Sequence, residues 1–183
     1  MKKLALALAV SGALALGVPA APATAAIETY EAKMTAASAA AQAREDMFEA
    51  FGPKVLKPGQ YLWRDVPASA GEDRVVVSLS DQLAYLYRGD TLAAVSTVSS
   101  GAGETPTPTG IFRVLEKKPM HHSRKYDNAP MPFTQFIDQY GIALHAGNIP
   151  GHPASHGCVR LPKQFAAKLF SVTGVGTPVL IGA

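Results

Sequence analysis

The residue types with the greatest chemical capacity gather in one short stretch, residues 145–162. It contains the only cysteine of the chain, Cys158, and three of its five histidines, His145, His152 and His156. A thiol becomes a good nucleophile when a neighbouring base takes its proton, and an imidazole can do this near neutral pH. The stretch therefore predicts a site of nucleophilic or metal chemistry around Cys158.

For nucleophilic chemistry, the spacing of two residues matters most. His145 is expected at the end of a strand, thirteen residues before Cys158, and the Gly- and Pro-rich segment between them could fold back. The imidazole would then act first as base and afterwards as acid. Gly157 leaves the approach to the thiol uncrowded, and backbone N–H groups around Gly157 and Cys158 could hold a developing oxyanion. These residues predict a cysteine nucleophile with His145 as its proton partner.

Two other interpretations of the same residues remain open. His152 and His156 lie four residues apart, and together with His145 and Cys158 they could supply zinc ligands. Against this, Pro153 disfavours the helix that would place the two histidines on one face. The third interpretation is a buried cysteine that only packs within a loop.

The N-terminus indicates the compartment in which the thiol works. Residues 1–25 begin with Met-Lys-Lys, continue with an apolar run of about 15 residues and end in small residues near Ala25. The run is shorter than the roughly 20 residues that span a bilayer, so this is typical of a secretory signal. We therefore predict export to the periplasm or cell wall, with no integral membrane segment after signal cleavage. A single exported cysteine such as Cys158 cannot form an internal disulfide, which favours a working thiol.

The charge balance bears on possible partners. The chain has 17 Lys and Arg against 14 Asp and Glu, for a net charge of +3. Removal of the signal would take Lys2 and Lys3 with it, leaving a nearly neutral protein. Together with export, this argues against a nucleic-acid partner. From Lys117 onward basic residues outnumber acidic ones, which favours an anionic substrate or a solvated surface; oligomeric state has no signature in the sequence.

Hydrophobic periodicity separates an N-terminal helical segment from a mostly β region. Residues 27–50 are Ala-rich and have the spacing of a weakly amphipathic helix, which either packs on the rest or only sets it apart. Beyond about residue 73 the period changes to that of strands, the first three joined as an antiparallel meander. The expected strands cover residues 74–80, 83–88, 92–98, 111–115, 140–145 and 178–181, and a short helix covers 162–170.

The segment at residues 116–128 is charged and carries His121 and His122. It is expected to be an exposed loop or excursion with solvated histidines. The nearby aromatic residues could line a substrate groove or pack in the core. They are Tyr126, Phe133 and Phe136.

Residues 155–160, Ser-His-Gly-Cys-Val-Arg, follow a Gly-Ile-Ala-Leu-His-Ala-Gly segment at residues 141–147. Together they resemble the signature of the L,D-transpeptidase (YkuD-like) catalytic domain. Residues 107–112, Thr-Pro-Thr-Gly-Ile-Phe, and 131–133, Met-Pro-Phe, resemble two more segments of that family, in the same order. The resemblance extends from about residue 74 to 181.

The resemblance implies a mostly β fold, a sandwich- or barrel-like domain with one or two short helices, preceded here by the Ala-rich helical segment. The chain would divide into a signal peptide (1–25), a helical segment with linker (26–73) and an L,D-transpeptidase catalytic domain (74–183). The family also implies peptidoglycan stem peptides as substrate and no metal or organic cofactor.

The implied activity is that of a cysteine acyltransferase. Cys158 would attack the carbonyl of the L-centre at stem position three and expel the terminal D-Ala, with His145 transferring protons and N–H groups near Gly157 holding the oxyanion. The thioester would pass to an amine of a second stem, forming a 3→3 crosslink, or to another wall acceptor. Water as acceptor would instead give an L,D-carboxypeptidase or endopeptidase, and a non-catalytic wall-binding module is the alternative outside enzymology.

Four positions around the motif carry further expectations. Ala146 stands where some members have a Ser that orients the histidine, so a backbone carbonyl is expected in that role. Arg160 stands where other members have Asn, and its guanidinium could lower the pKa of the thiol, bind a substrate carboxylate or serve the turn structurally. His156 is expected to brace the turn that presents the thiol, and Ser155 to bond nearby backbone groups.

Overall fold

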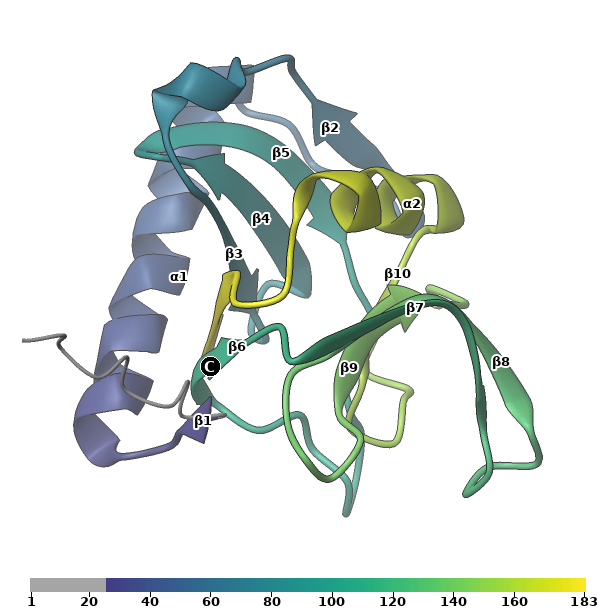
Figure 1. Ribbon diagram of the computed structural model, residues 1–183. Coiled ribbons are helices and arrows are strands. Elements are labelled where there is room, and N and C mark those ends of the chain that lie inside the picture. Colours follow the sequence, from purple (N-terminus) through teal and green to yellow (C-terminus); the bar gives the residue numbers. More distant parts are fainter. Residues whose placement is uncertain (1–25) are drawn as a thin grey trace, which may run out of the picture.

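The computed structural model describes residues 26–183, in which strands outnumber helices (Figure 1). The predicted signal segment, residues 1–25, lies outside the described residues. None of the helices in the described part is both long and apolar enough to cross a membrane. In chain order the elements are β1 (Ala26–Ile27), α1 (Tyr30–Phe51), β2 (Tyr61–Trp63), the 3-10 turn η1 (Ala68–Ala70), β3 (Asp73–Ser78), β4 (Leu83–Arg88), β5 (Thr91–Thr97), β6 (Gly110–Arg113), β7 (Glu116–Ser123), β8 (Ala129–Phe136), β9 (Ala143–Ala146), β10 (Val159–Leu161), α2 (Lys163–Val172) and β11 (Pro178–Gly182).

The strands form two sheets. One has seven strands in the order β1-β6-β11-β3-β4-β5-β2, and the other has four in the order β10-β9-β8-β7. The meander β3-β4-β5 is antiparallel, as the sequence predicts. Two pairs are parallel: β11 with β3, and β10 with β9. The mostly β fold class is confirmed.

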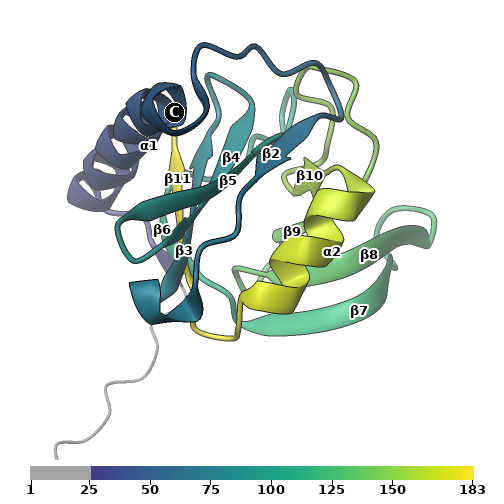
Figure 2. The ribbon, with the colours of Figure 1, turned by 90° about the horizontal axis from the view of Figure 1, so that it is seen from above.

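The main core lies between the two sheets and α2. Alternation along β3 directs Val75 and Val77 into this core and Val76 to the opposite face. From the smaller sheet Leu144 and Val159 enter the same core. Figure 2 shows α1 and α2 on opposite sides of the large sheet, so that each face of that sheet is covered by a different part of the chain.

Helix α1 packs on the outer face of the large sheet, which answers the question the sequence left open. Its buried stripe is almost entirely alanine, and the small side chains let the helix lie close to the strands. Under the helix, a Cβ on Gly182 of β11 would lie only 2.6 Å from the carbonyl oxygen of Ala36. The buried stripe consists of Ala32, Ala36, Ala40, Ala43 and Met47.

Both edge strands of the large sheet come from the segment before residue 73. β1 pairs with β6, and β2 pairs with β5. Trp63 of β2 packs edge-on against Phe165 of α2, with 5.9 Å between ring centroids. The N-terminal segment is therefore integrated into the sheet and the core.

The expectation of an exposed loop at residues 116–128 is wrong. Most of this segment forms β7, which pairs antiparallel with β8 in a hairpin that projects from the smaller sheet (Figure 1). Asp127 and Asn128 at the tip have φ of 44° and 53°, and the N–H of Ala129 donates to the carbonyl of Tyr126 at 2.8 Å. Two adjacent positive φ angles are typical of a type I′ hairpin turn. Because β7 is rich in Lys and His, it lacks the apolar alternation that signals a strand.

Candidate active site

Strand register places three of the predicted site residues on one face of the smaller sheet. β10 runs parallel to β9 with Arg160 opposite His145. Side chains alternate along a strand, and the neighbouring Val159 and Leu161 are buried in the main core. Arg160 and His145 therefore face away from that core, and Cys158, two residues before Arg160, faces the same way.

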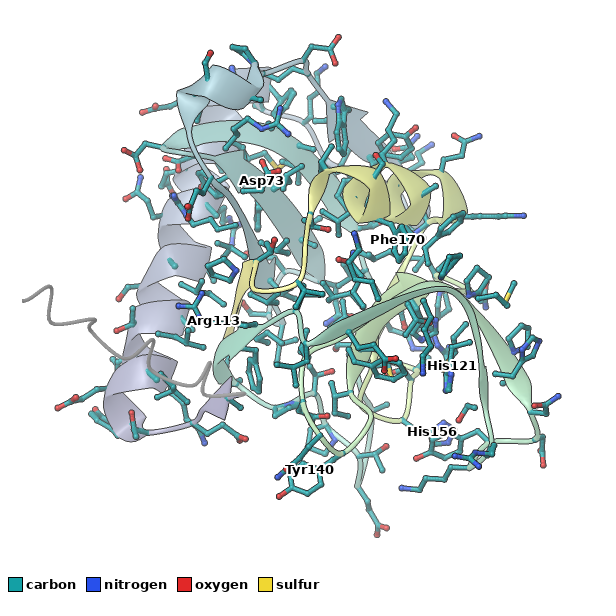
Figure 3. The ribbon with its side chains drawn as sticks, viewed as in Figure 1. Asp73, Arg113, His121, Tyr140, His156 and Phe170 are labelled. Carbon is teal, nitrogen blue, oxygen red and sulfur yellow. The ribbon has the colours of Figure 1, made fainter. Side chains whose placement is uncertain are left out.

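These three side chains line a groove of about 590 Å³. Residues of the β7–β8 hairpin and residues 140–142 complete the lining of the groove. Figure 3 shows His121 and His156 on the side of the hairpin, with Tyr140 further along. Further residues that line the groove are Arg124, Lys125, Tyr126, Met131, Phe136 and Asn148.

Cys158 is partly exposed, and its thiol donates to the carbonyl of Gly141 at 3.7 Å. Burial of the sulfur raises the pKa of Cys158, and the Asp138 carboxylate raises it further, while the backbone of Ala143 and the charge of Arg160 act in the opposite direction. The thiol is therefore protonated at neutral pH in the resting protein, and it needs a base to become a nucleophile.

The imidazole of His145 lines the same groove as the thiol. Its Nδ1 lies 2.9 Å from the carbonyl oxygen of Ala146, and because a carbonyl only accepts, Nδ1 carries the proton and Nε2 is left with a free lone pair. The backbone carbonyl thus holds the ring, as expected from Ala146. Burial lowers the pKa of His145, and the charges of Arg160 and His121 lower it further against the opposing bond to Ala146. The imidazole is consequently neutral and able to accept a proton at pH 7.

The turn that presents Cys158 is held from within by Ser155. The hydroxyl of Ser155 donates to the carbonyl of Cys158 and accepts from the N–H of Gly157 at 3.2 Å. Gly157 has φ of 110°, and a Cβ on it would lie 2.6 Å from Cδ1 of Ile142. The left-handed conformation therefore requires glycine before the thiol, and the Ile142 methyl group would have to move aside for any side chain there.

A second segment braces the same turn from outside. The loop after β5 forms β-bridges between Ser99 and Arg160 and between Gly101 and Ser155. From the same loop, the hydroxyl of Thr107 donates to the carbonyl of Gly157 at 2.8 Å. Sequence reasoning assigned no role to Thr107, although its segment was one that carried the family resemblance.

The histidines outside this pair have other surroundings. His156, expected to brace the turn, has an exposed ring that stacks on Tyr126 of the hairpin at 4.3 Å and 14°. His121, expected to be solvated in a loop, packs edge-on against Phe136 at 5.1 Å and lines the groove. His152 is exposed outside the groove.

The zinc alternative is not supported by the geometry. Within residues 26–183 no three His, Cys, Asp or Glu side chains are grouped as ligands for a metal ion.

The sequence left open whether the three nearby aromatic residues line a groove or pack in the core. Tyr126 and Phe136 line the groove, whereas Phe133 packs against Phe170.

Arg160 brings a positive charge to the groove. Its aliphatic stem packs against Gly147, where a Cβ would lie 3.0 Å from the Arg160 Cγ and Cδ. Within residues 26–183 no carboxylate lies within ion-pair distance of Arg160, and no acidic side chain lines the groove. The guanidinium is thus available for an anionic ligand.

Comparison with known proteins identifies the family. The family model of the L,D-transpeptidase catalytic domain (YkuD) matches residues 72–181. The chain belongs to this family. Its similarity to the putative L,D-transpeptidase YkuD of Bacillus licheniformis amounts to 28% identity over 114 residues, covering 59% of this chain and 64% of that protein.

Solved L,D-transpeptidase structures share the fold. The structure from Xylanimonas cellulosilytica has a TM-score of 0.56 at 28% identity over 65% of this chain and 64% of that one. The structure from Stackebrandtia nassauensis has a TM-score of 0.57 at 22% identity over 74% and 64%. An L,D-transpeptidase in complex with imipenem has a TM-score of 0.55 at 21% identity over 60% and 58%. The chain thus spans less than two thirds of each of these relatives.

Proposed function

We propose that this protein is an exported cysteine acyltransferase that cleaves peptidoglycan stem peptides at the L,D bond and passes the acyl group to an amine. The observation that carries the proposal is the shared placement of Cys158, His145 and Arg160 on one face of a groove that no acidic side chain of residues 26–183 lines. Membership of a family that acts on peptidoglycan peptides supports the substrate class.

In the acylation step, Sγ of Cys158 attacks the carbonyl carbon at stem position three while its proton passes to Nε2 of His145. Backbone N–H groups of the turn, that of Cys158 among them, hold the oxyanion. When the tetrahedral intermediate collapses, the C–N bond breaks and His145 gives its proton to the departing amine of D-Ala.

In the transfer step the roles reverse. An acceptor amine attacks the thioester and loses a proton to His145, the C–S bond breaks, and the sulfur recovers that proton. With a second stem as acceptor the product is a 3→3 crosslink. With water as acceptor the same thioester would give a carboxypeptidase or endopeptidase.

Arg160 fits the role of a carboxylate-binding residue. A peptidoglycan stem is a peptide with several carboxylates, and a guanidinium binds such a group through two parallel hydrogen bonds. The absence of an acidic partner among the described residues supports this role over a purely structural one.

The decisive experiment incubates the protein without residues 1–25 with a disaccharide tetrapeptide. We expect a 3→3 dimer together with free D-Ala; tripeptide alone would favour the hydrolytic alternative. Intact-mass analysis should show an acyl-enzyme in the wild type and none in Cys158→Ala. A covalent adduct on that variant would refute Cys158 as the nucleophile.

Acylation by imipenem distinguishes a catalytic protein from a non-catalytic wall-binding module. Imipenem is bound in one of the similar structures, and its strained lactam is an acyl donor for a nucleophilic thiol. A non-catalytic module would bind muropeptides and form no adduct with the tetrapeptide or with imipenem.

Export is tested by a separate experiment. After secretion the mature N-terminus should begin near residue 26, and recovery of a protein with intact Met1 from the cytoplasm would contradict export.

A further inference from the structure

Thr107 lies in the loop between β5 and β6 and is buried, with 4% of its surface exposed. Its hydroxyl makes two hydrogen bonds of 2.8 Å each: it donates to the carbonyl of Gly157 and accepts from the N–H of Gly101. A hydroxyl has one proton to donate. The proton of Thr107 is therefore committed to the residue that directly precedes Cys158.

The bond from Thr107 determines the direction of the next N–H along the chain. The peptide bonds of the described residues are trans, and a trans peptide is planar, with its C=O and N–H on opposite sides. When the carbonyl of Gly157 is held toward Thr107, the N–H of Cys158 must point the opposite way. Rotation of this peptide would turn both groups together.

The hydrogen bonds of Ser155 flank the Gly157–Cys158 peptide without holding it, so its direction depends on Thr107. Ser155 holds the N–H of Gly157 and the carbonyl of Cys158, on either side of the peptide in question. Behind the turn the backbones are in close contact, since a Cβ on Gly101 would lie 2.6 Å from the N of Thr107 and 2.8 Å from the Cα of Gly157. The hydroxyl therefore acts on a peptide packed directly against its own loop.

We propose that Thr107 is a positioning residue that aims the backbone N–H of Cys158 at the oxyanion of the tetrahedral intermediate. The inference rests on the proposed function, because an oxyanion forms only if Cys158 attacks a carbonyl. Thr107 itself does not line the groove. It acts through the Gly157–Cys158 peptide, fifty residues away along the chain.

Two reactions of the same thiol separate this role from simple support of the turn. Acylation by a stem tetrapeptide or imipenem forms a C–S bond at a carbonyl and passes through an oxyanion. Alkylation by iodoacetamide forms a C–S bond at a methylene carbon with loss of iodide, and the attacked carbon bears no oxyanion. A misdirected N–H should slow the first reaction and leave the second nearly unchanged.

The test compares Thr107→Val, which removes the hydroxyl at nearly constant volume, with Thr107→Ser, which keeps it. We expect Thr107→Val to lower the acylation rate roughly 10- to 100-fold, with alkylation within about threefold of wild type. Thr107→Ser should restore most of the acylation rate. The matched control is Thr105→Val, which loses a hydroxyl bond to the carbonyl of Ala102 in the same loop and should acylate normally.

Contrary results fall into distinct classes. If the wild type acylates and Thr107→Val does so at the same rate, or if acylation and alkylation fall together, the inference is overturned while the proposed function stands. If Thr107→Val does not fold, Thr107→Ala carries the same prediction, and loss of cooperative unfolding in both shows a structural role instead. If the wild type forms no acyl-enzyme, the proposed function fails and the inference with it.

Discussion

We expect Gly157→Ala to lower both the free energy of unfolding and the acylation rate. The structure gives two causes for the loss of stability. The new Cβ would lie 2.6 Å from Cδ1 of Ile142, and the backbone has φ of 110°, a conformation that L side chains rarely adopt. A sparsely populated conformation costs about 1–3 kcal/mol, and turning the end of the Ile142 side chain aside adds about 0.5–1.5 kcal/mol. The sum of about 1.5–4.5 kcal/mol is a large part of the 5–15 kcal/mol typical of a domain.

A double-mutant cycle tests these two causes. Ile142→Val removes the methyl group that meets the new Cβ but leaves the backbone strain. In urea unfolding, Gly157→Ala with Ile142→Val should therefore lose less stability than the sum of the single changes, with a coupling of about 0.5–1.5 kcal/mol. Additivity within about 0.3 kcal/mol would refute the contact as a cause.

The acylation rate gives an independent measurement on the same variants. A shift of the turn by about 1 Å can cost on the order of 100-fold in rate, so Gly157→Ala should acylate at least that much more slowly at a temperature where it is fully folded. The double variant should recover part of this loss. Wild-type acylation by folded Gly157→Ala would show that the turn tolerates the side chain.

Three further predictions address charge and packing. Burial lowers the pKa of His145 and the charge of Arg160 lowers it further, so the acid limb of the rate profile should lie below pH 6.5 in the wild type. The limb should move to higher pH in Arg160→Met and stay in place in Arg160→Lys, which should instead raise KM; an unmoved limb in Arg160→Met would contradict this. Lys117 donates to two backbone carbonyls at the end of α2, so Lys117→Met should lower the free energy of unfolding by about 1–3 kcal/mol. Lys118→Met removes a surface ion pair with Glu116 and a contact of the ammonium with the Phe136 ring, and should cost about 0–1 kcal/mol; equal losses in urea unfolding would contradict the role of the two Lys117 hydrogen bonds. Deletion of residues 26–51 uncovers the outer face of the large sheet and should abolish cooperative unfolding in calorimetry; a soluble truncated protein with an unchanged melting temperature would show that α1 is dispensable.

Much of the fold was predictable where the signal is local. The alternation at residues 74–98 predicts the antiparallel meander, and the Gly- and Pro-rich segment before Cys158 is irregular as expected. The β7 strand was missed because half of its side chains are Lys or His, which fit a loop equally well by composition. The positive φ angles at Asp127 and Asn128 show that the turn residues were the available signal.

The candidate site was likewise predictable from the sequence only in part. The residue types and spacing of His145 and Cys158 favour a thiol with a nearby base, beside the zinc and packing alternatives, since both lie within one short stretch. The contact of Thr107 with Gly157 spans fifty residues, and no local pattern specifies which buried hydroxyl will meet which carbonyl.

By itself, the sequence determined the family, the mostly β class and the identity of the chemical groups, because motif residues and strand periodicity are properties of neighbouring residues. The tertiary structure alone decided that α1 covers the large sheet, that the hairpin brings Tyr126 onto His156, and that the pKa of Cys158 is raised while that of His145 is lowered. These features depend on burial and on contacts between segments far apart in the chain, which exist only once the sheets, helices and loops have packed together.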